Sequence, residues 1–216
     1  MKRNIRNLVV IVTITVITPF MLAACATISP SVPQGIRGQY ASTGGGTSLL
    51  APLGFETNLR PKGPPGAYMF QTFNVEGVYT FKGDGTGSYK GLNHVVNLPF
   101  TMPNPNPPPP TITVPSNAGS SNVTFLFHYT VTNDRKITIK ADPGTYKTEW
   151  KSGPNAGNTS HFDGMVRTGF ISPDSKTITL TGGAPSVMSL IPPFGNMPPT
   201  TQMVLHSSAV LFYQHD

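Results

Sequence analysis

Alternation of apolar and polar residues over Asn122–Thr132 constrains the fold of this chain more than any other feature. One face carries Val123, Phe125, Phe127, Tyr129 and Val131, and the other carries Thr124, His128, Thr130 and Thr132, with Leu126 as the exception. A period of two is the spacing of a strand with one buried face, because successive side chains point to opposite sides of a sheet. The pattern therefore predicts a β-strand, a turn at 133–136 and a returning strand at 137–141.

Shorter alternating runs, separated by turn signals, recur on both sides of this hairpin. We expect strands at Ile36–Ser42, 75–81, Ser88–Thr101, Tyr146–Trp150, Thr177–Thr181 and Gln202–His215. The glycine-rich segment 83–87 and the segment 173–176 are the turn signals between them. Phe162, Val166 and Phe170 are expected to line one face of a further run that ends at the second of these turns.

The composition favours the same fold class. The 216 residues include 22 Gly and 23 Pro, and 11% are charged, against about 25% in an average soluble domain. Frequent Gly and Pro favour short elements joined by turns, and the low charge disfavours a solvated helical bundle. About eight or nine strands in hairpin order predict an all-β fold, a single antiparallel up-and-down β-barrel, since closure removes exposed strand edges. A two-sheet β-sandwich is the alternative.

Three long connections rich in proline are expected at 43–67, 101–118 and 183–200, the middle one with four successive prolines at 107–110. The first and third also carry large apolar residues, namely Leu49, Leu50, Leu53, Phe55, Met188, Leu190, Ile191, Phe194 and Met197. We interpret them as segments that pack on the barrel and cover its ends. The alternative is a lid over the barrel mouth or a docking surface, because loops of this length often carry function.

The N-terminus has the pattern of an export signal. Lys2, Arg3 and Arg6 precede an apolar stretch from Leu8 to Leu22, and small residues follow it. A basic head, an apolar centre and a small-residue exit are typical of a secretory signal, here an N-terminal signal helix over residues 1–24. The apolar stretch is shorter than the roughly 20 residues that a membrane span needs.

The end of this signal, Leu22-Ala23-Ala24-Cys25, resembles the lipobox of bacterial lipoproteins. The resemblance implies that a diacylglycerol is attached to the Cys25 thiol, that cleavage follows Ala24, and that the new amino group is acylated. The chain would then divide into a signal peptide (1–24), a lipidated cysteine with a flexible tether (25–35) and a β-barrel-like domain (36–216). Alternatively, Ala24-Cys25-Ala26 fits an ordinary secretory exit and gives a soluble secreted or periplasmic protein, or the segment stays uncut as an anchor.

The resemblance also implies a location in the cell envelope. Ala26, not Asp, follows the cysteine, which by resemblance to Gram-negative lipoproteins implies the outer membrane, and in a Gram-positive cell the outer face of the plasma membrane. The membrane would be the partner of the lipid. Cys25 is the only cysteine, so the domain can form no internal disulfide.

A second, short resemblance concerns Gly38-Gln39-Tyr40, which is similar to the Gly-x-Trp of lipocalin-like (calycin) barrels except that Tyr replaces Trp. It implies a barrel that carries a small hydrophobic ligand. The sequence does not indicate which residues would bind it.

Nucleic-acid and metal binding are not expected. The net charge of +6 falls to +3 without residues 1–24, and the remaining basic residues are scattered, whereas nucleic-acid binders concentrate them on one face. The five histidines, His94, His128, His161, His206 and His215, show no metal-ligand spacing. His161 and Asp163 could supply two ligands from one strand face, but no third is apparent, so we expect neither metal nor cofactor.

Catalysis is not expected either. Four aspartates, Asp84, Asp134, Asp142 and Asp174, lie in turn contexts, where Asp serves local hydrogen bonding. Glu76, Glu149 and Asp163 lie on predicted strands and could act with His161 only if the fold gathers them in one cleft. No nucleophile motif is present. The sequence thus predicts a non-enzymatic, lipid-anchored envelope protein with a structural or interaction role and an envelope protein as possible partner. The alternative is a lipocalin-like carrier, and a hydrolase has the least support.

Overall fold

A computed structural model describes residues 36–63, 66, 68–103, 111–181, 185–191 and 200–215. Its strands are β1 (Arg37–Ala51), β2 (Met69–Lys82), β3 (Thr86–Asn97), β4 (Phe100–Pro103), β5 (Thr111–Val114), β6 (Asn117–Val131), β7 (Lys136–Ala141), β8 (Tyr146–Trp150), β9 (Thr159–Asp163), β10 (Val166–Ile171), β11 (Thr177–Thr181), β12 (Ser186–Ile191) and β13 (Gln202–His215). The all-β class is confirmed for these residues. None of them belongs to a helix that could cross a membrane, and the expected signal helix lies outside them.

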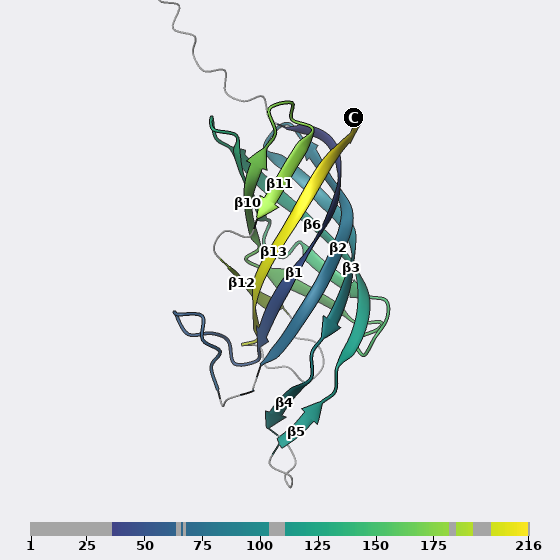
Figure 1. Cartoon of the computed structure of the whole chain (residues 1–216), viewed down its shortest axis with the longest axis vertical. Coiled ribbons are helices and arrows are strands. Elements are labelled where there is room, and N and C mark those ends of the chain that lie inside the picture. Colours follow the sequence, from purple (N-terminus) through teal and green to yellow (C-terminus); the bar gives the residue numbers. More distant parts are fainter. Residues whose placement is uncertain are drawn as a thin grey trace, which may run out of the picture. The chain divides into compact units, whose positions relative to one another are not determined.

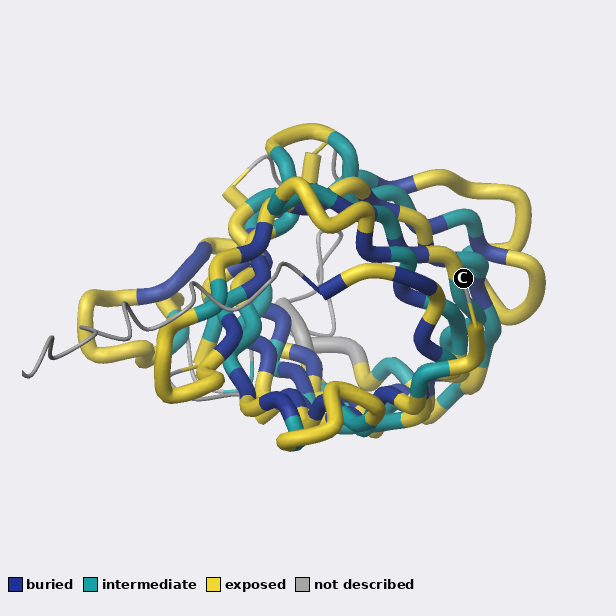
Figure 2. The backbone as a smooth tube through the Cα atoms, turned by 90° about the horizontal axis from the view of Figure 1, so that it is seen from above, coloured by how far each residue is buried: buried dark blue, intermediate teal, exposed yellow. Residues whose placement is uncertain are grey.

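The large sheet closes on itself. Its first strand, β1, pairs antiparallel with β2 along one edge and with β13 along the other. The result is a ring of eight strands in the order β1-β2-β3-β6-β7-β10-β11-β13. Figure 1 shows the long strands β1, β2, β3, β6 and β13 running obliquely side by side, and Figure 2 looks along the ring. The separate hairpin β4–β5 lies between β3 and β6 in the chain.

On one side of the ring, three strands are each broken into two segments. β7 and β8 both pair with β6, at successive positions along it. In the same way β10 pairs with β7 while β9 pairs with β8, and β11 and β12 both pair with β13. The five long strands are therefore joined into a closed ring at two levels along their length. At one level β7, β10 and β11 connect β6 to β13, and at the other β8, β9 and β12 do so.

The breaks are held together by side-chain hydrogen bonds to the backbone. The Asp163 carboxylate accepts from the Gly144 N–H at 2.6 Å, and the Ser186 hydroxyl donates to the Val166 carbonyl at 2.8 Å. These bonds replace ladder hydrogen bonds that a break removes, and they satisfy backbone groups that would otherwise lack partners.

Several strand predictions are confirmed. On β6 the side chains of Val123, Phe125, Phe127 and Tyr129 are buried, whereas Leu126 is 50% exposed. β8 and β13 have the expected bounds, as does β11, whose inward residues are Ile178 and Leu180.

The prediction that Phe162, Val166 and Phe170 share one face is wrong. Phe162 is buried, but Val166 is 38% exposed and Phe170 is 55% exposed. Gly164 separates β9 from β10 with a φ of 93°, and Met165 is buried beside it. The extra residue at this break shifts the alternation by one, and a shift by one turns every following side chain to the other face.

The expected long connections are also shorter than predicted. Residues 43–51 belong to β1, 101–103 and 111–114 to the β4–β5 hairpin, and β6 begins at Asn117. Gly44–Gly46 lie within β1, where a Cβ at Gly44 would lie 2.3 Å from the Ser208 carbonyl oxygen, so glycine serves the close approach of β1 and β13.

The third expected connection contains β12, on which Met188 and Leu190 are buried. The prolines at 107–110, together with Phe194 and Met197, lie outside the described residues. Residues 52–63 remain a connection, in which Phe55 is buried and donates its N–H to the Gln202 side chain on β13, whereas Leu53 is 46% exposed.

Side chains inside the ring fall into two groups along its length. The aromatic half comprises Tyr40, Tyr79, Phe81, Phe127 and Tyr129 with Ile137, Ile139, Ile178, Leu180 and Leu211, all buried. The centroids of the Phe81 and Tyr129 aromatic rings are 5.1 Å apart in an edge-to-face arrangement, which is a favourable geometry. The polar half, toward the other end, comprises Ser48, Gln71, Asn93, Asn97, Ser121, Thr148, Ser160 and Arg167, among apolar neighbours.

Candidate functional site

The residues expected to be lipidated and cleaved, Leu22, Ala23, Ala24 and Cys25, lie outside the described residues, as does the tether to Gly35. Their roles stay predictions.

The acidic residues on the strands do not form a common cleft with His161. Glu76 is exposed on β2, and β3 and β6 separate that strand from β8 in the sheet. The Asp163 carboxylate accepts a hydrogen bond from the Gly144 N–H, between β7 and β8. No group of three His, Cys, Asp or Glu side chains that could hold a metal ion occurs in the part of the chain that the structure describes.

Glu149 is paired with lysines on the outer face of β8. Its carboxylate lies 2.5 Å from Lys147 Nζ and 3.2 Å from Lys151 Nζ. Hydrogen bonds from these two lysines hold the pKa of Glu149 below its usual value, so it is an ionised surface group. Such exposed pairs contribute little to stability.

Three of the four turn aspartates bond locally, as predicted. The Asp84 carboxylate accepts from the Thr86 hydroxyl at 2.7 Å and from its N–H at 2.9 Å, and these bonds lower the pKa of Asp84. The Asp174 carboxylate accepts from the Ser172 hydroxyl, and Asp134 accepts from Thr132.

Asp142 differs from the other three. Its carboxylate lies 2.5 Å from His128 Nδ1, a pair that the sequence analysis did not anticipate. The His128 side chain is 69% exposed, so the pair is a solvated surface contact.

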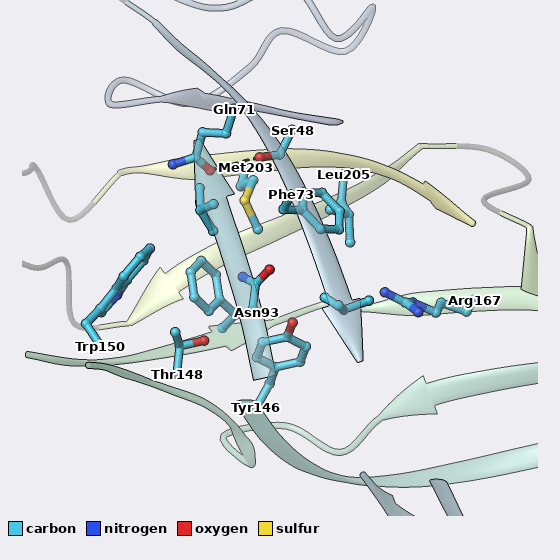
Figure 3. Close-up of a pocket in the computed structure, with 13 residues that line it drawn as sticks. Ser48, Gln71, Phe73, Asn93, Tyr146, Thr148, Trp150, Arg167, Met203 and Leu205 are labelled. Carbon is cyan, nitrogen blue, oxygen red and sulfur yellow. Dashed lines mark hydrogen bonds between the residues drawn. The ribbon is translucent and has the colours of Figure 1, made fainter. Parts of the chain in front are cut away.

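The polar half contains a cavity of about 60 Å³. Figure 3 shows side chains from several strands converging on it. Its lining is formed by Ser48, Gln71, Phe73, Val75, Asn93, Val95, Tyr146, Thr148, Trp150, Phe162, Arg167, Met203 and Leu205. Arg167 is the only charged residue among the described residues that line it.

Arg167 reaches this cavity from β10, directly beyond the Gly164 break. Its Nη1 donates to the Tyr79 hydroxyl at 3.3 Å. Its Nε is buried and has no hydrogen-bond partner among the described residues. The ion pairs found in this part of the chain do not include Arg167. A guanidinium group therefore faces the interior of the ring, and its only partner among the described residues is a neutral phenol.

Three tyrosines surround the guanidinium. Burial raises the pKa of Tyr146 to about 12 and also raises the pKa of Tyr79 and Tyr89, so all three phenols are neutral at physiological pH. For Arg167, burial opposes the charge, but the neighbouring phenols favour it, and the pKa of its guanidinium lies above the ordinary value. The cation persists inside the ring.

Two glycines make room for this cluster. A Cβ at Gly91 would lie 2.2 Å from the Tyr89 hydroxyl oxygen, and a Cβ at Gly77 would lie 2.8 Å from it. The absence of both side chains lets the Tyr89 ring lean along β3, where its hydroxyl donates to the Glu76 carbonyl at 3.3 Å. Bulkier residues at these positions would displace the ring from the cluster.

A row of hydrogen-bonded polar side chains crosses β1, β2, β3 and β6 at the end of the polar half that lies away from the aromatic half. Ser48 donates to the Gln71 amide oxygen at 2.9 Å, and Gln71 donates to the Asn97 amide oxygen at 2.6 Å. Asn97 in turn donates to Asn117 at 2.5 Å. These residues are register partners on β1, β2, β3 and β6, so the row follows the sheet.

Sequence reasoning missed Arg167 because the predicted face of 162–170 placed Val166 inward and Arg167 outward. The available signal was Gly164, since an isolated glycine within a strand pattern indicates a bulge. Shifting the alternation by one residue after it places Arg167, Gly169 and Ile171 inward, as the structure has them.

Comparisons with known proteins add no assignment. No protein-family model matches the chain, and no curated protein matches it.

Proposed function

We propose that the chain is a lipid-anchored lipoprotein of the cell envelope, whose domain has a non-enzymatic structural or interaction role. The anchor rests on the basic head, the apolar stretch and the sequence Leu22-Ala23-Ala24-Cys25. Two or more acyl chains on one residue give stable attachment, whereas one chain gives only marginal binding.

We infer that the closed ring is an up-and-down β-barrel and not a two-sheet sandwich. The pairing of β1 with β13 over residues 39–51 supports this, because a sandwich leaves strand edges at the sides of its sheets. Continuity of β7 with β8, β9 with β10 and β11 with β12 would give eight strands in chain order. Tyr40, at the position of the lipocalin Trp, is buried in the aromatic half.

The observation that favours an interaction role over a carrier role is that the described residues largely fill the interior of the ring. A small-molecule pocket usually measures about 300–1,000 Å³. The cavity at Arg167 measures about 60 Å³, and aromatic side chains occupy the other half of the ring. A hydrophobic ligand of ordinary size would have to displace these side chains.

The anchor is tested by growing cells with an alkyne-bearing fatty acid and fractionating them. We expect the protein to carry the label and to sediment with membranes. Cys25→Ser should abolish both, while Ser29→Ala, just beyond the lipobox, should leave both unchanged. Labelling of Cys25→Ser equal to that of the unchanged protein would overturn the proposal.

A further inference from the structure

We propose that the cavity in the polar half binds a small planar anion of the carboxylate class on the guanidinium of Arg167. The proposal concerns the inside of the ring and does not depend on lipid anchoring.

The first support is an uncompensated cation. A guanidinium has five N–H donors, and one of those of Arg167 has a partner among the described residues, the neutral Tyr79 hydroxyl. The buried Nε has none there. Burying a charge without a counter-charge is strongly unfavourable, so buried cations are normally paired. An anion in the adjoining cavity would supply the missing charge.

The second support is the set of polar groups around the same cavity. In Figure 3 the guanidinium end of Arg167 points toward the side on which Asn93 and Tyr146 lie. The buried Asn93 amide oxygen has no partner in the described part of the chain, and rotation of the amide would present its NH₂ group instead. The neutral Tyr146 phenol is a further donor. These groups can complete the coordination of an anion that Arg167 begins.

The third support is size and shape. About 60 Å³ is room for a few water molecules or an anion of similar size, and not for a long acyl chain. The planar guanidinium fork matches the two oxygens of a carboxylate. Phe73, Met203 and Leu205 form apolar walls, and charge-assisted hydrogen bonds strengthen when water is excluded. Acetate and formate are therefore the probes that fit.

The test is a titration of the purified ¹⁵N-labelled protein with sodium acetate, at constant ionic strength maintained with a bulky sulfonate. We expect a saturable shift of the Arg167 Nε–H resonance and a rise in Tm with acetate, since a ligand that binds the folded state stabilises it by mass action. Formate should act in the same way. The bulky sulfonate alone should cause neither change.

Three variants sharpen the test. Arg167→Met should lose the acetate-dependent rise in Tm, whereas Lys90→Met, which removes an exposed charge from the outer face of β3, should retain it. Tyr146→Phe should weaken acetate binding about ten-fold, as loss of a hydrogen bond to a charged group does. Absence of a saturable resonance shift in the unchanged protein, or an equal rise in Tm for Arg167→Met, would overturn the proposal. The resonance shift in the unchanged protein decides the question even if Arg167→Met does not fold.

Discussion

The aromatic half and the polar half of the ring are built by the same five long strands, yet their interiors differ in chemistry. Phe81, Phe127 and Tyr129 pack edge to face in the aromatic half and need few hydrogen bonds. In the polar half, Ser48, Gln71 and Asn97 face inward and satisfy one another in a row. A closed sheet can therefore be stabilised by apolar burial at one end and by a connected polar network at the other.

The largest expected effect tests the aromatic half. Phe127 is fully buried, so Phe127→Ala removes an aromatic ring and leaves a cavity. We expect a loss of about 3–5 kcal/mol in the free energy of unfolding. Leu126→Ala, the 50% exposed neighbour on the same strand, should change it by less than about 0.5 kcal/mol. Equal losses in denaturant titrations would contradict the assignment of faces on β6.

The next effect tests the break that turns Arg167 inward. Gly164 has a φ of 93°, and a Cβ there would lie 2.7 Å from the Val187 carbonyl oxygen. Gly164→Ala should therefore cost about 3 kcal/mol. Gly157→Ala is the matched control, with a φ of 84° and open space around its Cβ, and should cost about 1 kcal/mol. If urea denaturation gives Gly164→Ala the smaller loss, the account of the break is wrong.

A smaller effect is expected in the polar half. Gln71→Leu would leave the Ser48 hydroxyl and the Asn97 amide oxygen without their partner, which should cost about 1–2 kcal/mol. Asn74→Leu, at an exposed position of the same strand, should cost less than about 0.5 kcal/mol. Equal unfolding midpoints for Gln71→Leu and the unchanged protein would mean that the polar row does not stabilise this end.

A further effect appears only at alkaline pH, beside the Arg167 cavity. Burial raises the pKa of Tyr146 from 10.0 to about 12 in the folded protein. The folded state thus retains the phenol proton longer than the unfolded chain, so this stabilisation is complete below pH 10 and is lost as the pH approaches 12. The free energy of unfolding should fall over this interval, less steeply for Tyr146→Phe. Tyr68→Phe, which removes the hydroxyl of a 41% exposed side chain, should retain the slope of the unchanged protein.

The difference between the halves also explains what could be predicted from the sequence. Strands with an apolar inward face, such as β6 and β11, show a clear period of two. In the polar half the inward residues Ser48, Gln71 and Asn97 are as polar as outward ones, so the alternation disappears there. Without clear alternation to indicate a strand, the prolines of 43–67 led to the prediction of a connection there, although residues 43–51 belong to β1.

Arg167 escaped prediction for a related reason. A single extra residue at Gly164 reverses the faces, and local periodicity contains no information about which positions of a strand pair with its neighbours. Its hydrogen-bond partner Tyr79 lies on β2, and Asn93, which lines the same cavity, lies on β3, both far away in the chain. The proposed lipobox, in contrast, is a contiguous sequence pattern that can be recognised without knowledge of the fold.

Intact-mass spectrometry of the protein extracted from its own membrane tests the proposed function most directly. We expect a chain that begins at Cys25 and carries a covalent diacylglycerol, and native spectra without a bound hydrophobic ligand. A chain that begins after residue 25, or an unmodified Cys25 thiol, would contradict the anchor, and a co-purified lipid-sized ligand inside the domain would contradict the filled interior.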